Sequence, residues 1–169
     1  GLIGGPSALF VSSLWGGTDA SYVCNNDLTA SGADPAEWRP REAPTGHVQV
    51  LVQNPVEQVF AMAFTDSGHA QPRGITVSLS SRAWADPDRA EVIRLDYNVT
   101  NYSTADVSNY HAGLFVDWDV VDALTNVGGT DAATHSVWIG EPDGEVYGMA
   151  AIGDAPVSNV AVIDNIEYV

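Results

Sequence analysis

Carboxylate and amide side chains gather at positions 110–131, in the stretch YHAGLFVDWDVVDALTNVGGTD. If the first half of this stretch is a β-strand, Asp117 and Asp119 project from one face, roughly 6–7 Å apart. Carboxylates this close repel each other unless water, a hydrogen-bond donor or a cation lies between them. The loop that follows adds amide and carboxylate oxygens, which are the ligands that calcium prefers. The pattern predicts a calcium site formed by Asp117, Asp119, Asn126 and Asp131.

Two other interpretations of this stretch stand beside the calcium site. One is a strand with a polar outer face that leads into a solvated acidic loop. The other is a hydrolase that uses Asp117 and Asp119 as a catalytic pair. The sequence has no Gly-x-Ser-x-Gly elbow, no His-Glu-x-x-His pair and no glycine-rich phosphate loop. We therefore expect that this domain is not an enzyme.

The charge of the chain limits its partners. Among 169 residues there are 22 acidic side chains and six arginines, and lysine does not occur, which gives a net charge of −16. Such a surface repels nucleic acid and anionic membranes, because it lacks the basic patch that binds phosphate. An acidic, lysine-free composition suits a high-salt habitat or a protein that binds divalent cations. No apolar run approaches the roughly 20 residues of a membrane helix, so we expect no membrane insertion.

Apolar and polar residues alternate along most of the chain from His47 onward. At positions 91–101, for example, Ile93, Leu95, Tyr97 and Val99 share one face, opposite Arg94, Asp96 and Asn98. Turn residues separate such segments, as at Asp66-Ser67-Gly68 and Glu141-Pro142-Asp143-Gly144. Before His47, a first strand is expected at positions 8–14. Glycine, asparagine and proline are dense at positions 16–45, where at most one short strand is expected, near positions 21–24. The pattern predicts a single all-β domain over residues 1–169, an antiparallel β-sandwich of about 9–11 strands with one long N-terminal loop excursion.

Features outside the acidic stretch suggest alternative functions. Trp15 and Trp38 lie in loop-rich sequence, and exposed aromatic faces stack on sugars, so a carbohydrate-binding module is one alternative. Positions 1–14 are glycine-rich, apolar and uncharged. A segment of this kind can add as a strand to the sheet of a second copy, so a self-assembling surface or filament subunit is another alternative. Cys24, the only cysteine, cannot form an internal disulfide, and we expect it to be buried.

Three segments together resemble a known family: positions 56–85, EVIRLDYNVTNYS at 91–103, and GLFVDWDV at 113–120 followed by NVGGTD. They are similar to a non-catalytic β-domain of large secreted proteins of Bacteroidetes and related bacteria. In that family the domain often sits beside subtilisin-like serine peptidase domains or type IX secretion sorting domains. The loop Gly129-Thr130-Asp131 departs from the family pattern, in which an aromatic residue precedes the aspartate.

The resemblance implies an extracellular or cell-surface location and other domains of the same protein as partners. We therefore expect a non-catalytic accessory or structural domain, stabilised by calcium, within a larger secreted protein. Because the family domain often sits beside a peptidase domain, the resemblance is compatible with a peptidase elsewhere in the parent protein. The self-assembling subunit and the carbohydrate-binding module stand as the alternatives.

Overall fold

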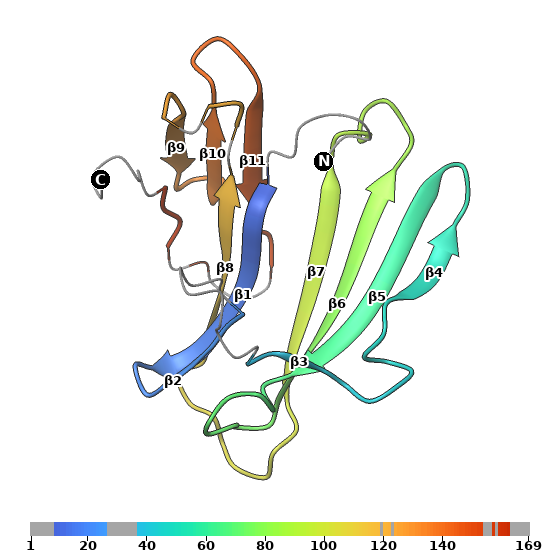
Figure 1. The fold of residues 1–169 in the computed structure, drawn as a ribbon, viewed down its shortest axis with the longest axis vertical. Coiled ribbons are helices and arrows are strands. Elements are labelled where there is room, and N and C mark those ends of the chain that lie inside the picture. The colour runs from blue at the N-terminus through green and yellow to red at the C-terminus, as the bar shows by residue number, and fades with distance from the viewer. Residues whose placement is uncertain are drawn as a thin grey trace. The chain divides into compact units, whose positions relative to one another are not determined.

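The computed structural model describes residues 9–26, 37–118, 120–122, 124–153, 157 and 159–162, and these form eleven β-strands and no helix. The strands, labelled in Figure 1, are β1 (Leu9–Asp19), β2 (Tyr22–Cys24), β3 (Arg39–Pro40), β4 (Gln49–Gln53), β5 (Glu57–Thr65), β6 (Ile75–Trp84), β7 (Ile93–Asn101), β8 (His111–Trp118), β9 (Val127–Asp131), β10 (Ser136–Gly140) and β11 (Val146–Ala150). The all-β prediction is therefore confirmed. The described residues contain no helix with the length and apolar character that crossing a membrane requires.

The chain divides into two compact units. One is Ser13–Phe115, and the other contains the described residues before Ser13 and from Val116 onward. Strands β1 and β8 continue from one unit into the other, whereas each remaining strand belongs to a single unit. The division into two compact units does not test whether residues 1–169 form one domain, so that expectation stays a prediction.

The larger unit contains a five-stranded sheet with the order β3-β5-β6-β7, in which β4 also pairs with β5. Strands β5, β6 and β7 form antiparallel ladders without a bulge. Because these ladders are unbroken, successive side chains of each strand point to opposite faces of the sheet along its whole length. The pairing of β4 with β5 shifts between Val50 and Val52, so Leu51 is the extra residue of a bulge.

Strand β1 extends further than the sequence predicts, since the turn-forming glycines lie inside it. Gly16 pairs with Cys24 and Gly17 with Val23, which places β2 alongside β1 in the sheet order β2-β1-β8. Gly16 is required there, because a Cβ at this position would collide with the hydroxyl of Tyr110. The predicted short strand near positions 21–24 is confirmed as β2.

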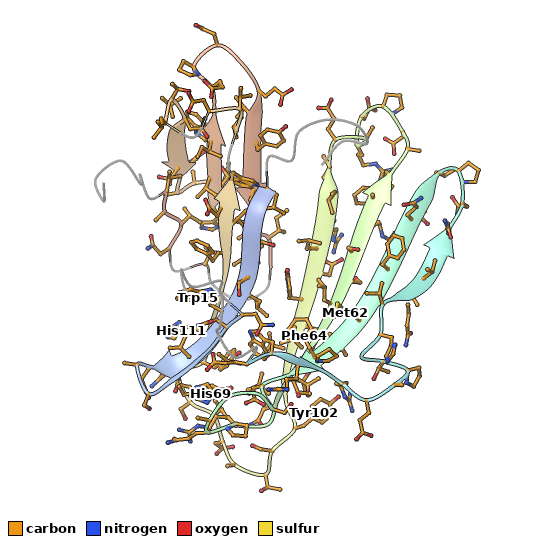
Figure 2. All side chains as sticks on the ribbon, in the orientation of Figure 1. Trp15, Met62, Phe64, His69, Tyr102 and His111 are labelled. Carbon is orange, nitrogen blue, oxygen red and sulfur yellow. The ribbon has the colours of Figure 1, made fainter. Side chains whose placement is uncertain are left out.

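The two sheets of the larger unit meet in a common core, which makes this unit a β-sandwich. The buried residues are Tyr22 and Cys24 from β2, Ile75 and Val77 from β6, and Trp38. Partly buried side chains pack against them, namely Leu14, Phe64, Tyr97, Val107 and Tyr110. Figure 2 shows Phe64 near the end of β5. The β-sandwich prediction is confirmed, and Trp38 shows that the N-terminal excursion returns to the core before β3.

The second unit contains the antiparallel meander β9-β10-β11. Strand β10 pairs with both neighbours over its full length, from Ser136 to Gly140. The predicted turn at Glu141–Gly144 is present, and the Gly144 amide donates to the Glu141 carbonyl at 3.3 Å. Val120 is fully buried, whereas the large side chains of Val121 and Leu124 are exposed.

Candidate functional site

The structure separates two of the four predicted calcium ligands. Asn126 directly precedes β9, and Asp131 is the last residue of that strand. Five residues of extended strand span about 17 Å. Calcium ligands lie about 2.5 Å from the ion, so two of them are at most about 5 Å apart. Asn126 and Asp131 therefore cannot share one ion in this structure.

Of the other two predicted ligands, the structure describes only Asp117. Asp117 is half-buried in strand β8. Asp119 lies outside the described residues. Among the residues that the structure does describe, no three histidine, cysteine, aspartate or glutamate side chains are grouped closely enough to hold a metal ion. Calcium binding stays a prediction.

Asn126 closes the loop before β9 by hydrogen bonds. Its Oδ1 accepts from the Val120 amide at 3.1 Å, and its Nδ2 donates to the carbonyls of Val120 at 2.7 Å and Asp122 at 2.9 Å. One amide side chain thus satisfies several backbone groups of the loop that leads to β9. Asn126 therefore has a structural role, since both its Oδ1 and its Nδ2 atoms already form hydrogen bonds.

Glu141 completes this network, although the sequence places it in a surface turn. Its Oε1 accepts from Asn126 Nδ2 at 2.9 Å and from the Asp122 amide at 3.3 Å, and its Oε2 accepts from Thr125 Oγ1 at 2.9 Å. The acidic loop is therefore held by donors that face a carboxylate. Nothing in the local sequence of Glu141 indicates this role, because its partners lie 15 or more residues away.

Asp131 organises the turn between β9 and β10. Its Oδ1 accepts from the Ala133 amide at 2.8 Å, and its Oδ2 accepts from Thr134 Oγ1 at 2.9 Å. These two hydrogen bonds, first the one from Thr134, lower the pKa of the Asp131 carboxyl below its usual value. The arrangement is typical of an aspartate that starts a turn.

A second carboxylate network lies inside the larger unit, around Asp66. This side chain is 1% exposed. Its Oδ2 accepts from the Tyr22 hydroxyl at 2.7 Å and the Arg73 amide at 2.6 Å, and its Oδ1 accepts from the Ile75 amide at 3.1 Å. The sequence predicts only a turn at Asp66-Ser67-Gly68. The structure shows that the same aspartate ties β2 to the connection between β5 and β6.

Tyr22 and Cys24, which lie near Asp66, have raised pKa values and stay protonated at neutral pH. Burial, followed by the hydrogen bond to Asp66, raises the pKa of Tyr22. Burial also raises the pKa of the Cys24 thiol, which is fully buried as predicted. His69 Nε2 lies 3.7 Å from Glu37 Oε1, and the His69 ring contacts the edge of Tyr22. A thiol with a raised pKa is a poor nucleophile, so Cys24 is a structural residue of the core.

The tryptophans divide between core and surface. Trp38 is 4% exposed and its Nε1 donates to the Leu14 carbonyl at 2.8 Å, so it cannot present a face to a sugar. Trp15 remains partly exposed on β1, where Figure 2 labels it. Its ring lies 6.1 Å from that of Phe115, which is exposed to a similar degree. The two rings form a small aromatic surface.

A shallow groove of about 440 Å³ crosses the face of the five-stranded sheet that points away from the core. Small residues create it, since alanine and serine side chains line β5 and β6 at its floor. Polar groups of Gln49, Asp96 and Asn98 stand at its sides. The groove offers hydrogen-bonding groups and no aromatic stacking surface other than part of Tyr97.

The hairpin formed by β4 and β5 exposes aliphatic side chains that a sheet normally buries. The large exposed residues there are Val48, Val50, Leu51 and Val56. Positions 48–56, VQVLVQNPV, contain no charged residue, although the whole chain has a net charge of −16. Exposed apolar patches of this kind mark surfaces that contact another protein.

Comparisons of this chain with family models, with curated proteins and with solved structures gave no match. The fold and these surfaces define an all-β protein built on antiparallel sheets. The resemblance to the secreted bacterial β-domain stays a prediction.

Proposed function

We propose that this chain is a non-catalytic accessory domain of a secreted or cell-surface bacterial protein. In this role it packs against other domains of the same protein through the β4–β5 hairpin. The observation that supports the proposal is the row of exposed aliphatic residues on a charge-free edge, Val48, Val50, Leu51 and Val56. The sequence resemblance to domains that sit beside other secreted modules points in the same direction.

The electrostatics favour this use of the hairpin. The rest of the surface is acidic and repels other acidic surfaces, whereas an uncharged apolar strip adds no such repulsion. Natural edge strands usually carry charge or proline against unwanted pairing, and β4 (Gln49–Gln53) carries neither. An edge without this protection is expected where a neighbouring domain covers it.

The complete reading frame provides the test. We expect it to encode further domains, and we expect this domain to melt at a higher temperature within the full protein than alone. Leu51→Asp should remove that difference, because it places a charge in the contact. Ile152→Asp is the matched control, since Ile152 is 96% exposed and lies outside the hairpin. Equal melting alone and in the full protein, or a reading frame without other domains, would refute the proposal.

A second candidate function rests on Trp15 and Phe115. Two neighbouring exposed rings on one sheet can stack on the apolar faces of sugars. Isothermal titration of the chain with a panel of soluble polysaccharides tests this function. Binding that Trp15→Ala abolishes, and that Trp138→Ala leaves intact, would favour it over the accessory role.

A further inference from the structure

Strand β7 is an edge strand of the five-stranded sheet in the part of the chain that the structure describes. It is the last strand in the order β3-β5-β6-β7, and within the described part of the chain no strand pairs with its other side (Figure 1). It runs for nine residues, Ile93–Asn101, in unbroken register with β6. It contains no proline and no bulge, and the only charges on it are those of Arg94 and Asp96, which have opposite signs.

The direction of the backbone groups follows from one hydrogen bond. The Tyr102 amide donates to the Gly74 carbonyl at 2.9 Å, so the peptide groups of Tyr102 face β6. Peptide groups along a strand face alternate sides. Those of Arg94 and Asp96 therefore also face β6, whereas those of Ile93, Leu95 and Tyr97 point away from it.

Two of the residues whose peptide groups point away from β6 also have apolar side chains that are unusually exposed on the face of the sheet. Ile93 is 70% exposed and Leu95 is 44% exposed. On the opposite face, Arg94 Nη2 lies 2.7 Å from Asp96 Oδ1, and both side chains are largely solvated. Strand β7 thus has outward peptide groups that no strand of the described residues pairs with, an apolar face, and two unlike charges spaced two residues apart.

We propose that β7 pairs with β7 of a second copy of this chain, antiparallel and centred on Leu95. Leu95 then lies opposite Leu95 of the second copy, and Ile93 lies opposite Tyr97. These pairs exchange N–H···O bonds, because their peptide groups point outward. Arg94 lies opposite Asp96 of the second copy on both sides of the axis. These charges occupy non-hydrogen-bonded positions, where cross-strand side chains come closest.

The charge pattern selects this register over its neighbours. Centring the pair on Arg94 places Arg94 opposite itself, and centring it on Asp96 places Asp96 opposite itself. Like charges directly opposite each other are destabilising. Registers centred on Ile93 or Tyr97 place each charge opposite an uncharged residue. Only the arrangement centred on Leu95 joins unlike charges twice.

The residues around Arg94 favour the approach of a second carboxylate to its guanidinium group. On β6 its direct cross-strand partner is Arg82, a like charge. Arg82 Nη1 lies 3.2 Å from Glu57 Oε2, and Arg94 forms an ion pair with Asp96 of its own strand. In the dimer Arg94 gains Asp96 of the second copy on the side away from Arg82. This interface differs from the β4–β5 hairpin and does not depend on the accessory role.

Sedimentation equilibrium tests the dimer through complementary charge reversals. We expect the wild-type chain to dimerise, and Arg94→Asp or Asp96→Arg alone to weaken the dimer by about tenfold or more, since each creates two like-charge pairs. An equimolar mixture of the two variants should form a mixed dimer as tight as the wild type. In that mixture both unlike pairs are restored across the interface.

Two further variants serve as controls for the dimer experiment. Asp143→Arg changes the net charge as Asp96→Arg does but lies in the exposed β10–β11 turn, and it should leave the dimer unchanged. Leu95→Pro removes an outward N–H without touching the β6 ladder, and it should yield a folded monomer. The proposal is overturned by a wild-type chain that stays monomeric, by a dimer insensitive to Asp96→Arg, or by variants that fail to complement.

Discussion

Two carboxylate networks in this protein use the same chemistry at different depths. Asp66 accepts from a tyrosine hydroxyl and two backbone amides while 1% exposed. Glu141 accepts from an asparagine, a threonine and a backbone amide in a half-buried position. A buried donor that loses its acceptor bears the full cost of desolvation, whereas a solvated donor turns to water. Equal numbers of hydrogen bonds should therefore contribute unequally to stability.

The largest effect is expected at Asp66. Asp66→Ala leaves the Tyr22 hydroxyl and two amides without an acceptor inside the core, which should cost about 3–5 kcal/mol in the free energy of unfolding. Urea denaturation followed by tryptophan fluorescence measures this loss. Glu141→Ala is the comparison, and a loss as large as that of Asp66→Ala would contradict the role of burial.

Two tyrosines of the same core differ in whether the hydroxyl forms a hydrogen bond, so replacing each with phenylalanine tests the contribution of that bond. Tyr22→Phe should cost about 1.5–3 kcal/mol, because it removes a donor to a carboxylate. Tyr110 has a buried hydroxyl without a hydrogen-bond partner in the described structure. Tyr110→Phe should therefore leave stability unchanged or raise it by about 1 kcal/mol. A loss of stability in urea denaturation for Tyr22→Phe but not for Tyr110→Phe would support this assignment, and equal losses would refute it.

Alkaline pH should weaken the larger unit. Burial raises the pKa of Tyr22, Tyr97 and Tyr110, whose usual value is about 10. Above pH 10 the unfolded chain releases these protons while the folded chain keeps them, so stability is present below pH 10 and falls above it. The loss due to Tyr22 is at most about 1.4 kcal/mol per pH unit. Urea midpoints between pH 8 and 11 measure it, and Tyr22→Phe should flatten the slope.

The loop before β9 should respond more weakly. Asn126→Ala removes hydrogen bonds in a half-buried loop, and water can replace several of them, so we expect a loss of about 1 kcal/mol. Hydrogen exchange should show faster opening of the amides near Val120, with the larger unit unaffected. A loss equal to that of Asp66→Ala would show that this loop is as critical as the buried core.

The smallest expected effect concerns calcium. Asp131→Asn should leave the calcium dependence of the melting temperature unchanged, because Asp131 lies at the far end of β9 from Asn126. Asp117→Asn is the comparison, since Asp117 is a predicted ligand at the end of a different strand, β8. Sodium chloride at matched ionic strength separates specific binding from screening of the −16 charge. A calcium-specific response that requires Asp131 would restore the original four-residue site.

Several particular elements show where sequence reasoning succeeds. The alternation at positions 91–101 predicted β7, and the Glu-Pro-Asp-Gly segment predicted the β10–β11 turn, because both depend on neighbouring residues alone. Gly16 and Gly17 misled the prediction of β1, since a close approach to Tyr110 and β2 requires glycine within a strand. The short sequence spacing of Asn126 and Asp131 placed them in one predicted calcium site, but the extended strand β9 separates them in the structure.

By itself the sequence determined the all-β class, most of the strands and the acidic, lysine-free surface, because backbone preference, side-chain alternation and charge are local properties. Only the tertiary structure decided that Asp66 is buried beneath Tyr22, that Trp38 belongs to the core, and that Glu141 holds the loop of Asn126. Each of these depends on contacts between residues far apart in the chain. The spacing of residue types along a sequence carries no information about such distances until the strands are paired.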